Sequence, residues 1–118
     1  MRPPSGAFVL AYLSGDAIGC GAIKHQPGNV TDIKRMWVTE SARGLGLGRR
    51  LLAHLEGLAR EHGSSEAHLE TSDVLPEAIA LYRSAGYVEV PAFNDEPFAD
   101  RWFTKPLLDT ESPSSRRP

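Results

Sequence analysis

The residues with the clearest chemical potential are three alternating glycines flanked by arginines in the middle of the chain. Gly44, Gly46 and Gly48 lie within the segment Arg43–Arg49, and a long stretch with helical spacing follows. Glycine has no Cβ, so a ligand can approach the backbone closely. A loop of this kind that opens a helix points successive N–H groups outward and adds the positive end of the helix dipole. The pattern predicts a phosphate or pyrophosphate site with permanent cations beside it.

Other phosphate-binding motifs fit this segment less well. A P-loop ends in Gly-Lys followed by Ser or Thr, whereas Gly48 is followed by Arg49 and Arg50. The dinucleotide-binding pattern G-x-G-x-x-G would need a glycine at position 49. A flexible turn before a helix is the plain alternative, but such a turn rarely needs three glycines and three arginines.

The elements that would position this loop begin with three strands. Residues 7–14 and 17–25 are rich in strand-forming side chains, and Gly15–Asp16 between them is a tight-turn signal, so we predict a β-hairpin. A third strand is predicted at 32–39. Regular alternation would put its residues on two faces, with Ile33, Arg35 and Trp37 on one and Lys34, Met36 and Val38 on the other.

A helix is predicted at 49–62 from apolar residues at helical spacing, with Gly63 as its stop. The remaining expected elements are a strand at 67–71, a helix from Pro76 to about Gly86, and strands at 87–91 and 101–107. This mixture predicts an α/β fold of the α+β type, with a largely antiparallel sheet and flanking helices. We expect a single domain over 1–108 and a disordered tail over 109–118.

Composition places the chain among globular domains and argues against several kinds of partner. Of its 118 residues, 41% are hydrophobic and 24% are charged, unlike disordered chains. The net charge of −2 and the lack of a basic groove with interleaved aromatics predict no nucleic-acid partner. No apolar stretch approaches the length of a membrane helix, so no membrane partner is expected. A single cysteine and an N-terminus unlike a signal peptide lead us to expect a cytoplasmic protein.

Neither the cysteine nor the histidines suggest a reactive or metal site. Cys20 stands between two glycines in an apolar strand, without a neighbouring histidine or cation, so we interpret it as an inert core residue. The four histidines lack metal-ligand spacing, and His54 and His62 fall among or beside the polar positions of the predicted helix. We therefore predict no bound metal.

Two motifs in order resemble the GNAT family of N-acetyltransferases. The segment Lys34–Val38 followed by the glycine loop is similar to the family's acetyl-CoA signature, in which Gln or Arg precedes two spaced small residues. Arg43, Gly46 and Gly48 fill those positions. The segment Glu77–Tyr87 is similar to the family's A-I-x-L-Y-x-x-x-G-F motif. The resemblance covers most of the chain and implies the acyl-CoA N-acyltransferase fold.

The family fold normally begins with a strand and two helices ahead of the hairpin. Only six residues precede Ala7, so we expect a version of the fold that lacks these elements. The helices commonly shape the acceptor pocket in the family. Without them, an uncovered sheet face or edge would suit a homodimer.

The resemblance implies direct transfer of the acetyl group of acetyl-CoA, as co-substrate, to an amine of a small molecule or polypeptide. The alternatives are a non-catalytic acyl-CoA-binding or regulatory module and, less favoured, a nucleotide-phosphate-binding domain. A bulge in the strand at 32–39 would open the sheet for the pantetheine arm, and a backbone N–H near Val38 would face the developing oxyanion. The implied cofactor-binding residues are Met36, Trp37, Val38, Arg43, Gly44, Leu45, Gly46, Leu47, Gly48 and Arg49.

Two proton transfers require further residues. An amine with a pKa near 10.4 is an ammonium at pH 7, and freeing its lone pair costs about 4–5 kcal/mol, so a base must take the proton. Glu70 is the candidate base, with Glu40 and Asp73 as rivals. Tyr82 matches the family's position for the acid that protonates the leaving thiolate, although a tyrosine there also suits the apolar face of a core helix.

Overall fold

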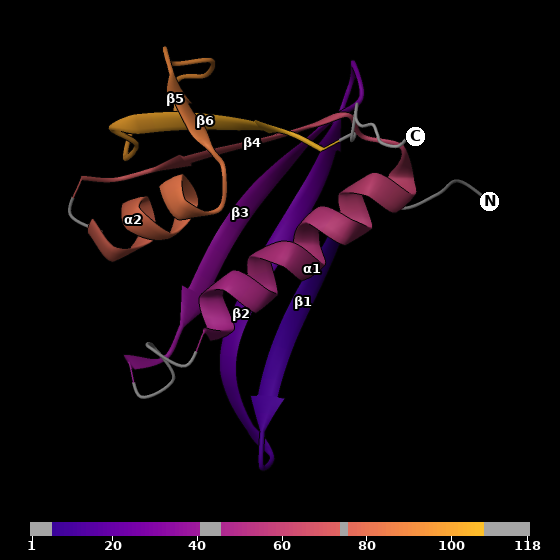
Figure 1. The fold of residues 1–118 in the computed structure, drawn as a ribbon, viewed down its shortest axis with the longest axis vertical. Coiled ribbons are helices and arrows are strands. Elements are labelled where there is room, and N and C mark those ends of the chain that lie inside the picture. The colour runs from indigo at the N-terminus through magenta and orange to yellow at the C-terminus, as the bar shows by residue number, and fades with distance from the viewer. Residues whose placement is uncertain (1–5, 41–45, 74–75, 108–118) are drawn as a thin grey trace, which may run out of the picture.

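The computed structural model describes residues 6–40, 46–73 and 76–107, which form strands and two helices (Figure 1). In chain order the elements are β1 (Gly6–Leu13), β2 (Asp16–Gln26), β3 (Val30–Val38), α1 (Leu47–His62), β4 (Glu66–Thr71), α2 (Pro76–Ser84), β5 (Val88–Val90) and β6 (Arg101–Pro106). Neither helix in these ranges combines the length and apolar character needed to cross a membrane.

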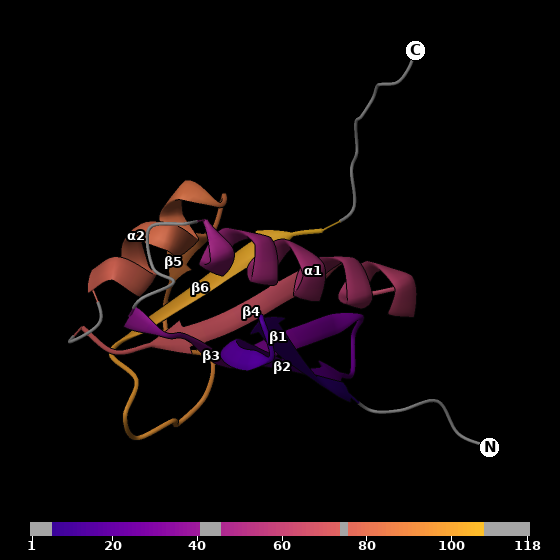
Figure 2. The ribbon, with the colours of Figure 1, turned by 90° about the horizontal axis from the view of Figure 1, so that it is seen from below.

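The strands form one sheet in the order β1-β2-β3-β4-β6-β5. Neighbouring strands are antiparallel except β3 and β4, which are parallel. Both helices cover the same face of this sheet (Figure 2). Strand alternation puts Phe8, Cys20, Lys34, Glu70 and Trp102 on the opposite face, which we call the helix-free face. The arrangement confirms the predicted α/β fold with a largely antiparallel sheet.

The β1–β2 hairpin forms as predicted, but its turn lies one residue earlier than expected. Leu13 pairs with Asp16, so the turn residues are Ser14 and Gly15, and the prediction of Gly15–Asp16 is wrong. Both turn residues have positive φ angles, 53° and 88°, as a two-residue hairpin turn requires. The sequence did not indicate Ser14 as a turn residue, because Asn, Asp or Gly usually stands at the first position of such a turn.

Helix α1 begins two residues before the predicted start and ends at the predicted glycine. Gly63 has a φ of 99°, and its N–H donates to the Arg60 carbonyl, which closes the helix. The helix lies close to the sheet because β2 has a glycine beneath it. A Cβ on Gly21 would lie 2.6 Å from Cδ1 of Leu55.

A single cluster of buried side chains joins both helices to the sheet. Its members are Ile23, Ile33, Leu52, Leu55, Ala59, Ala67, Leu69, Tyr82, Tyr87, Phe103 and Leu107. Full burial of one large apolar side chain contributes about 1.5–3 kcal/mol. Both helices share this core, and residues from their first turns line one pocket together with residues of β3.

Candidate active site

A bulge in β3 reverses the alternation that the sequence predicted. The pairing of β3 with β2 shifts by one residue between Lys34 and Trp37. Arg35 lies in this span with a φ of 57°, and its side chain is exposed. The extra residue turns Met36 toward the helices, on the side of Ile33. The predicted bulge is therefore confirmed, whereas the predicted grouping of Ile33 with Arg35 and Trp37 is wrong.

The bulge accompanies a separation of β3 from β4. The two strands pair only through three positions, the last of which joins Asp32 to His68. Beyond that pair, β3 continues to Val38 and β4 to Thr71 without pairing to each other. The sheet therefore opens between its two parallel strands, next to the first turns of both helices.

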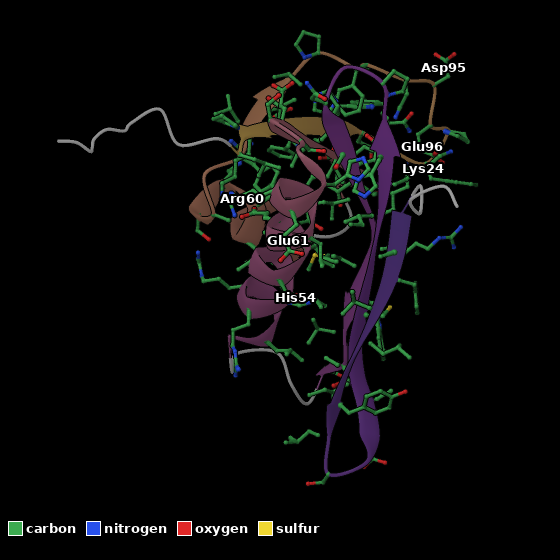
Figure 3. All side chains as sticks on the ribbon, turned by 90° about the vertical axis from the view of Figure 1, so that its right-hand side faces the viewer. Lys24, His54, Arg60, Glu61, Asp95 and Glu96 are labelled. Carbon is green, nitrogen blue, oxygen red and sulfur yellow. The ribbon has the colours of Figure 1, made fainter. Side chains whose placement is uncertain are left out.

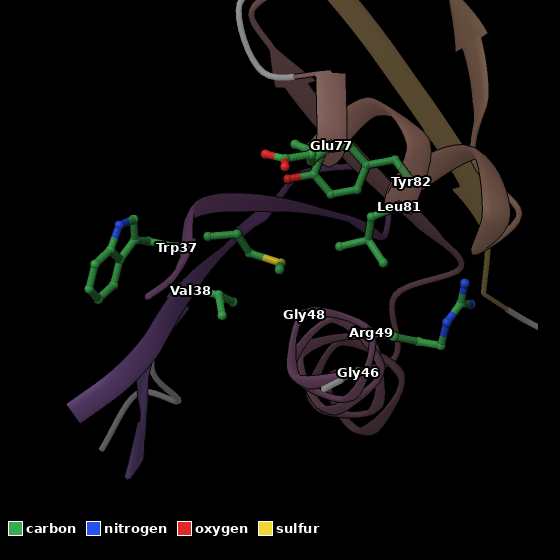
Figure 4. A pocket seen from close by; sticks show the side chains of 10 residues that line it. Trp37, Val38, Gly46, Gly48, Arg49, Glu77, Leu81 and Tyr82 are labelled. Atoms are coloured by element: carbon green, nitrogen blue, oxygen red, sulfur yellow. The ribbon is translucent and has the colours of Figure 1, made fainter. Parts of the chain in front are cut away.

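A pocket of about 460 Å³ lies at this opening (Figure 4). The structure brings together seven residues that the sequence analysis assigned to one site: Met36, Trp37, Val38, Gly46, Gly48, Arg49 and Tyr82. Glu77, Ala78 and Leu81 complete the lining and were not predicted as site residues. Their signal was available, because all three belong to the same sequence motif as Tyr82.

The α1 end of the pocket has the features of an anion site. Gly46, just before the helix, has a left-handed φ of 79°, and none of the described side chains caps the first N–H groups of α1. The first turn holds no carboxylate, although a carboxylate stabilises a helix start, and instead holds Arg49 and Arg50. Gly48 keeps the lining close to α2, because a Cβ there would lie 3.2 Å from Cδ2 of Leu81.

Tyr82 belongs both to the core and to the pocket. The residue is 7% exposed, and its ring lies edge-on to that of Tyr87 with centroids 6.0 Å apart. Burial raises the pKa of its hydroxyl above the ordinary value of tyrosine. Figure 4 shows the Tyr82 ring on the same side of α2 as Glu77, both facing the opening. Tyr82 therefore packs in the core and also lines the pocket in which a proton donor was expected.

Glu70 does not line the pocket and lies on the helix-free face instead. Its Oε2 accepts a hydrogen bond of 3.0 Å from Lys34 Nζ, and its Oε1 accepts one of 3.1 Å from Asn94 Nδ2. The side chain is 11% exposed. Of the two rivals, Asp73 accepts from Arg101, and Glu40 is exposed just beyond β3.

Several other predicted residues lie away from the pocket or outside the described ranges. Arg43, Gly44 and Leu45 fall outside the residues that the structure describes. Leu47 lines a different groove, between α1 and β1. Cys20, expected in the core, is partly exposed on the helix-free face, and its thiol donates to the Arg35 carbonyl. Among the described residues, no three His, Cys, Asp or Glu side chains cluster in a way that would hold a metal ion.

Comparisons with known proteins agree on one family. The model of the acetyltransferase (GNAT) family matches residues 1–87. The IAA acetyltransferase of Azospirillum brasilense is 42% identical over 90 residues, which cover 75% of this chain and 59% of that relative. The chain thus spans about three fifths of the relative's length.

Two solved structures share the fold. A GNAT-family acetyltransferase from Staphylococcus aureus matches with a TM-score of 0.81 and 23% identity, over 87% of this chain and 69% of that one. The PaiA N-acetyltransferase of Thermoplasma acidophilum, solved in complex with coenzyme A, matches with a TM-score of 0.76 and 18% identity, over 86% and 61%. Because the family model matches well over half of the residues, the chain belongs to the acetyltransferase (GNAT) family.

Proposed function

We propose that this protein transfers the acetyl group of acetyl-CoA to an amine. The observation that carries the proposal is the pocket where β3 leaves β4, which the start of α1 and the first turns of α2 enclose. Family membership and the structural neighbour solved with coenzyme A support the same activity. The relatives named as acetyltransferases are longer than this chain, so a direct assay is required.

The residues at the start of α1 fit the pyrophosphate of coenzyme A. The positive end of α1 and the cation of Arg49, which lines the pocket, favour an anion in this part of the pocket. Gly46 and Gly48 add no side chain that would fill this space. We expect the neighbouring residues Arg43, Gly44 and Leu45 to contribute to the same cofactor site, and Leu47, whose side chain lines the other groove, to contribute through its backbone N–H.

The part of β3 beyond Asp32, which pairs with β2 on one side and has separated from β4 on the other, suits the pantetheine arm. Met36 and Val38 line the pocket on the helix side, whereas Trp37 points away from it and is 51% exposed (Figure 4). An extended chain beside this strand would run where β4 has left the sheet, in the manner of an added strand. The acetyl thioester would then lie toward Tyr82.

Glu70 and Tyr82 provide the two proton transfers in this proposal. The acceptor ammonium gives a proton to Glu70, and the free amine attacks the thioester carbonyl, so a C–N bond forms as the C–S bond breaks. The leaving thiolate accepts a hydrogen bond from Tyr82 and takes the Tyr82 proton, and the second proton that the attacking nitrogen loses as the amide forms returns to the Tyr82 oxygen. A tyrosine pKa near 10 exceeds a thiol pKa near 8.5, and burial raises that of Tyr82 further, so the proton moves late in the step.

The test separates this activity from its alternatives. Calorimetry should show binding of coenzyme A but not of ATP, and a nucleotide-binding domain would show the reverse preference. Thiol release from acetyl-CoA should rise when amines are added. Tight coenzyme A binding without amine-dependent thiol release would favour the non-catalytic acyl-CoA-binding module.

We also propose that a second copy of this chain covers β1, which ends the sheet. The strand has no charged residue, and Phe8, Leu10, Tyr12 and Leu13 are exposed, whereas edge strands usually carry charges that prevent pairing. Figure 3 looks onto this edge, with His54 and Glu61 on the adjacent side of α1. The free Cys20 supports a cytoplasmic location for this dimer.

A further inference from the structure

One ion pair spans the place where β3 and β4 separate. Lys34 and Glu70 each lie two residues beyond the last paired position, Asp32 with His68. Both side chains are on the helix-free face, and Lys34 Nζ lies 3.0 Å from Glu70 Oε2. Met36 and Val38, further along β3, line the pocket on the other face. The pair therefore lies across the sheet from the proposed cofactor site, at the same opening.

A second contact fixes the orientation of Glu70. Asn94 Oδ1 accepts hydrogen bonds from Trp102 Nε1 at 2.8 Å and from the backbone N–H of Glu96 at 3.2 Å. Its Nδ2 is therefore the group that donates to Glu70 Oε1. Asn94 holds one carboxylate oxygen in place and leaves the other for a cation.

Lys34, the cation that pairs with Glu70 Oε2, can be exchanged for another ammonium at small cost. Lys34 is 30% exposed, whereas Glu70 is 11% exposed. An ion pair of a partly exposed lysine contributes little to stability, so its exchange for another ammonium has a small cost. An amine that displaced Lys34, however, would leave two cations side by side unless it also carried an anion for Lys34.

We propose that the Lys34–Glu70 pair selects acceptors that carry both an ammonium and a nearby carboxylate, as an amino acid does. The acceptor ammonium takes the place of Lys34 at Glu70 Oε2, and its carboxylate pairs with Lys34. Both charges stay paired, and the acceptor nitrogen is held beside the proposed base. This inference rests on the proposed acetyl transfer and narrows its acceptor.

Paired acceptors provide the first test. Rates of acetyl-CoA-dependent thiol release are measured with amino acids and with the corresponding amino-acid amides, which keep the ammonium and lack the carboxylate. We expect the KM of the acid to lie at least about tenfold below that of the amide. Calorimetry of the same two ligands, in the presence of coenzyme A, should show the same preference without turnover.

Variants provide the second test. Lys34→Gln keeps a hydrogen-bond donor near Glu70 but removes the charge, so it should raise the KM of the acid about tenfold and abolish the preference over the amide. The matched control is Lys24→Gln, at an exposed lysine of β2, which should keep the wild-type preference. Coenzyme A affinity should be unchanged in both variants.

The outcomes separate this inference from the proposed function. Equal use of acids and amides by the wild type, or an unchanged preference in Lys34→Gln, would overturn the inference and leave acetyl transfer intact. Binding of coenzyme A without acetylation of either class would overturn both. An ion pair that only joins the separated strands would lower the stability of Lys34→Gln without altering the choice of acceptor.

Discussion

The imidazole rings of His25, in β2, and His62, in the last turn of α1, stack in parallel with centroids 3.5 Å apart. His25 Nδ1 also lies 2.8 Å from Thr31 Oγ1, which in turn contacts the Ser64 hydroxyl. These contacts join the C-terminal end of α1 to the sheet, at the opposite end of the helix from the pocket. Burial, and to a lesser extent the charge of His62, lower the pKa of His25.

This pair predicts that the free energy of unfolding decreases as pH falls from 7.5 to 5.5. The unfolded chain protonates His25 near pH 6.5, whereas the folded protein does so only at lower pH, so the unfolded state binds more protons over this interval. Urea unfolding at the two pH values measures the decrease. This decrease should be smaller in His25→Gln than in the wild type. It should equal the wild-type decrease in His54→Gln, because His54 is an exposed histidine of α1, the helix that holds His62. Equal decreases in all three proteins would contradict the assignment.

A second prediction concerns Glu56, which is 4% exposed within α1. Its carboxylate accepts a 2.8 Å hydrogen bond from the Tyr87 hydroxyl and pairs with Lys105 Nζ at 3.0 Å. Glu56→Gln removes the charge that satisfies Lys105, so it should lower the free energy of unfolding by roughly 1.5–3 kcal/mol. Glu61→Gln, on the exposed side of the same helix, should change it by less than about 0.5 kcal/mol. Similar urea midpoints for both variants would show that the network contributes little.

Two glycines of α1 test the cofactor site. Gly48→Val adds a branched side chain at a position where even a Cβ would lie 3.2 Å from Leu81, so it should weaken coenzyme A binding at least about tenfold. Gly57→Val is the matched control, because a Cβ at Gly57 meets nothing within 4 Å. Calorimetry with coenzyme A, together with thermal unfolding, distinguishes a blocked pocket from a damaged fold. Equal affinities of the two variants for coenzyme A would show that Gly48 does not line the cofactor site.

Local signals made much of this fold predictable from the sequence. The hairpin, the apolar face of α1 and its stop at Gly63 each depend on neighbouring residues, and the glycine loop marked the start of the pocket. The bulge at Arg35 had no such signal, because it depends on how β3 pairs with β2. The burial of Glu56 likewise had no local signal, because its partners Tyr87 and Lys105 come from distant segments of the chain.

The candidate site likewise contains residues that sequence motifs predicted and residues that only strand pairing brings together. Motif residues such as Gly48 and Tyr82 were assigned together from the sequence and lie together in the pocket. Lys34 and Glu70 are 36 residues apart, and only the parallel register of β3 and β4 brings them into contact. Periodicity predicts which face a residue occupies, but strand order and register decide which distant residue lies beside it.

Tyr82 gives a prediction that separates catalysis from packing. Tyr82→Phe keeps the buried ring and removes the hydroxyl, so turnover should fall at least about tenfold while coenzyme A affinity stays near the wild-type value. Tyr87→Phe, in the ring next to it, removes the hydrogen bond to Glu56 and should lower stability while turnover is retained. Steady-state rates and urea unfolding of both variants provide the measurement. Retained turnover in Tyr82→Phe would leave this residue with a packing role only.

The proposed dimer depends on the apolar edge of β1 and is tested by a charge placed there. Leu10 is 47% exposed, so Leu10→Lys leaves the buried core unchanged, but two lysines would meet across antiparallel β1 strands and repel one another. We expect the wild type to sediment as a dimer and Leu10→Lys as a monomer. Val88→Lys is the matched control, because Val88 is 62% exposed on β5, at the other end of the sheet, and its variant should remain a dimer. A monomeric wild type would show that no second copy covers β1, and dissociation of both variants would place the interface elsewhere.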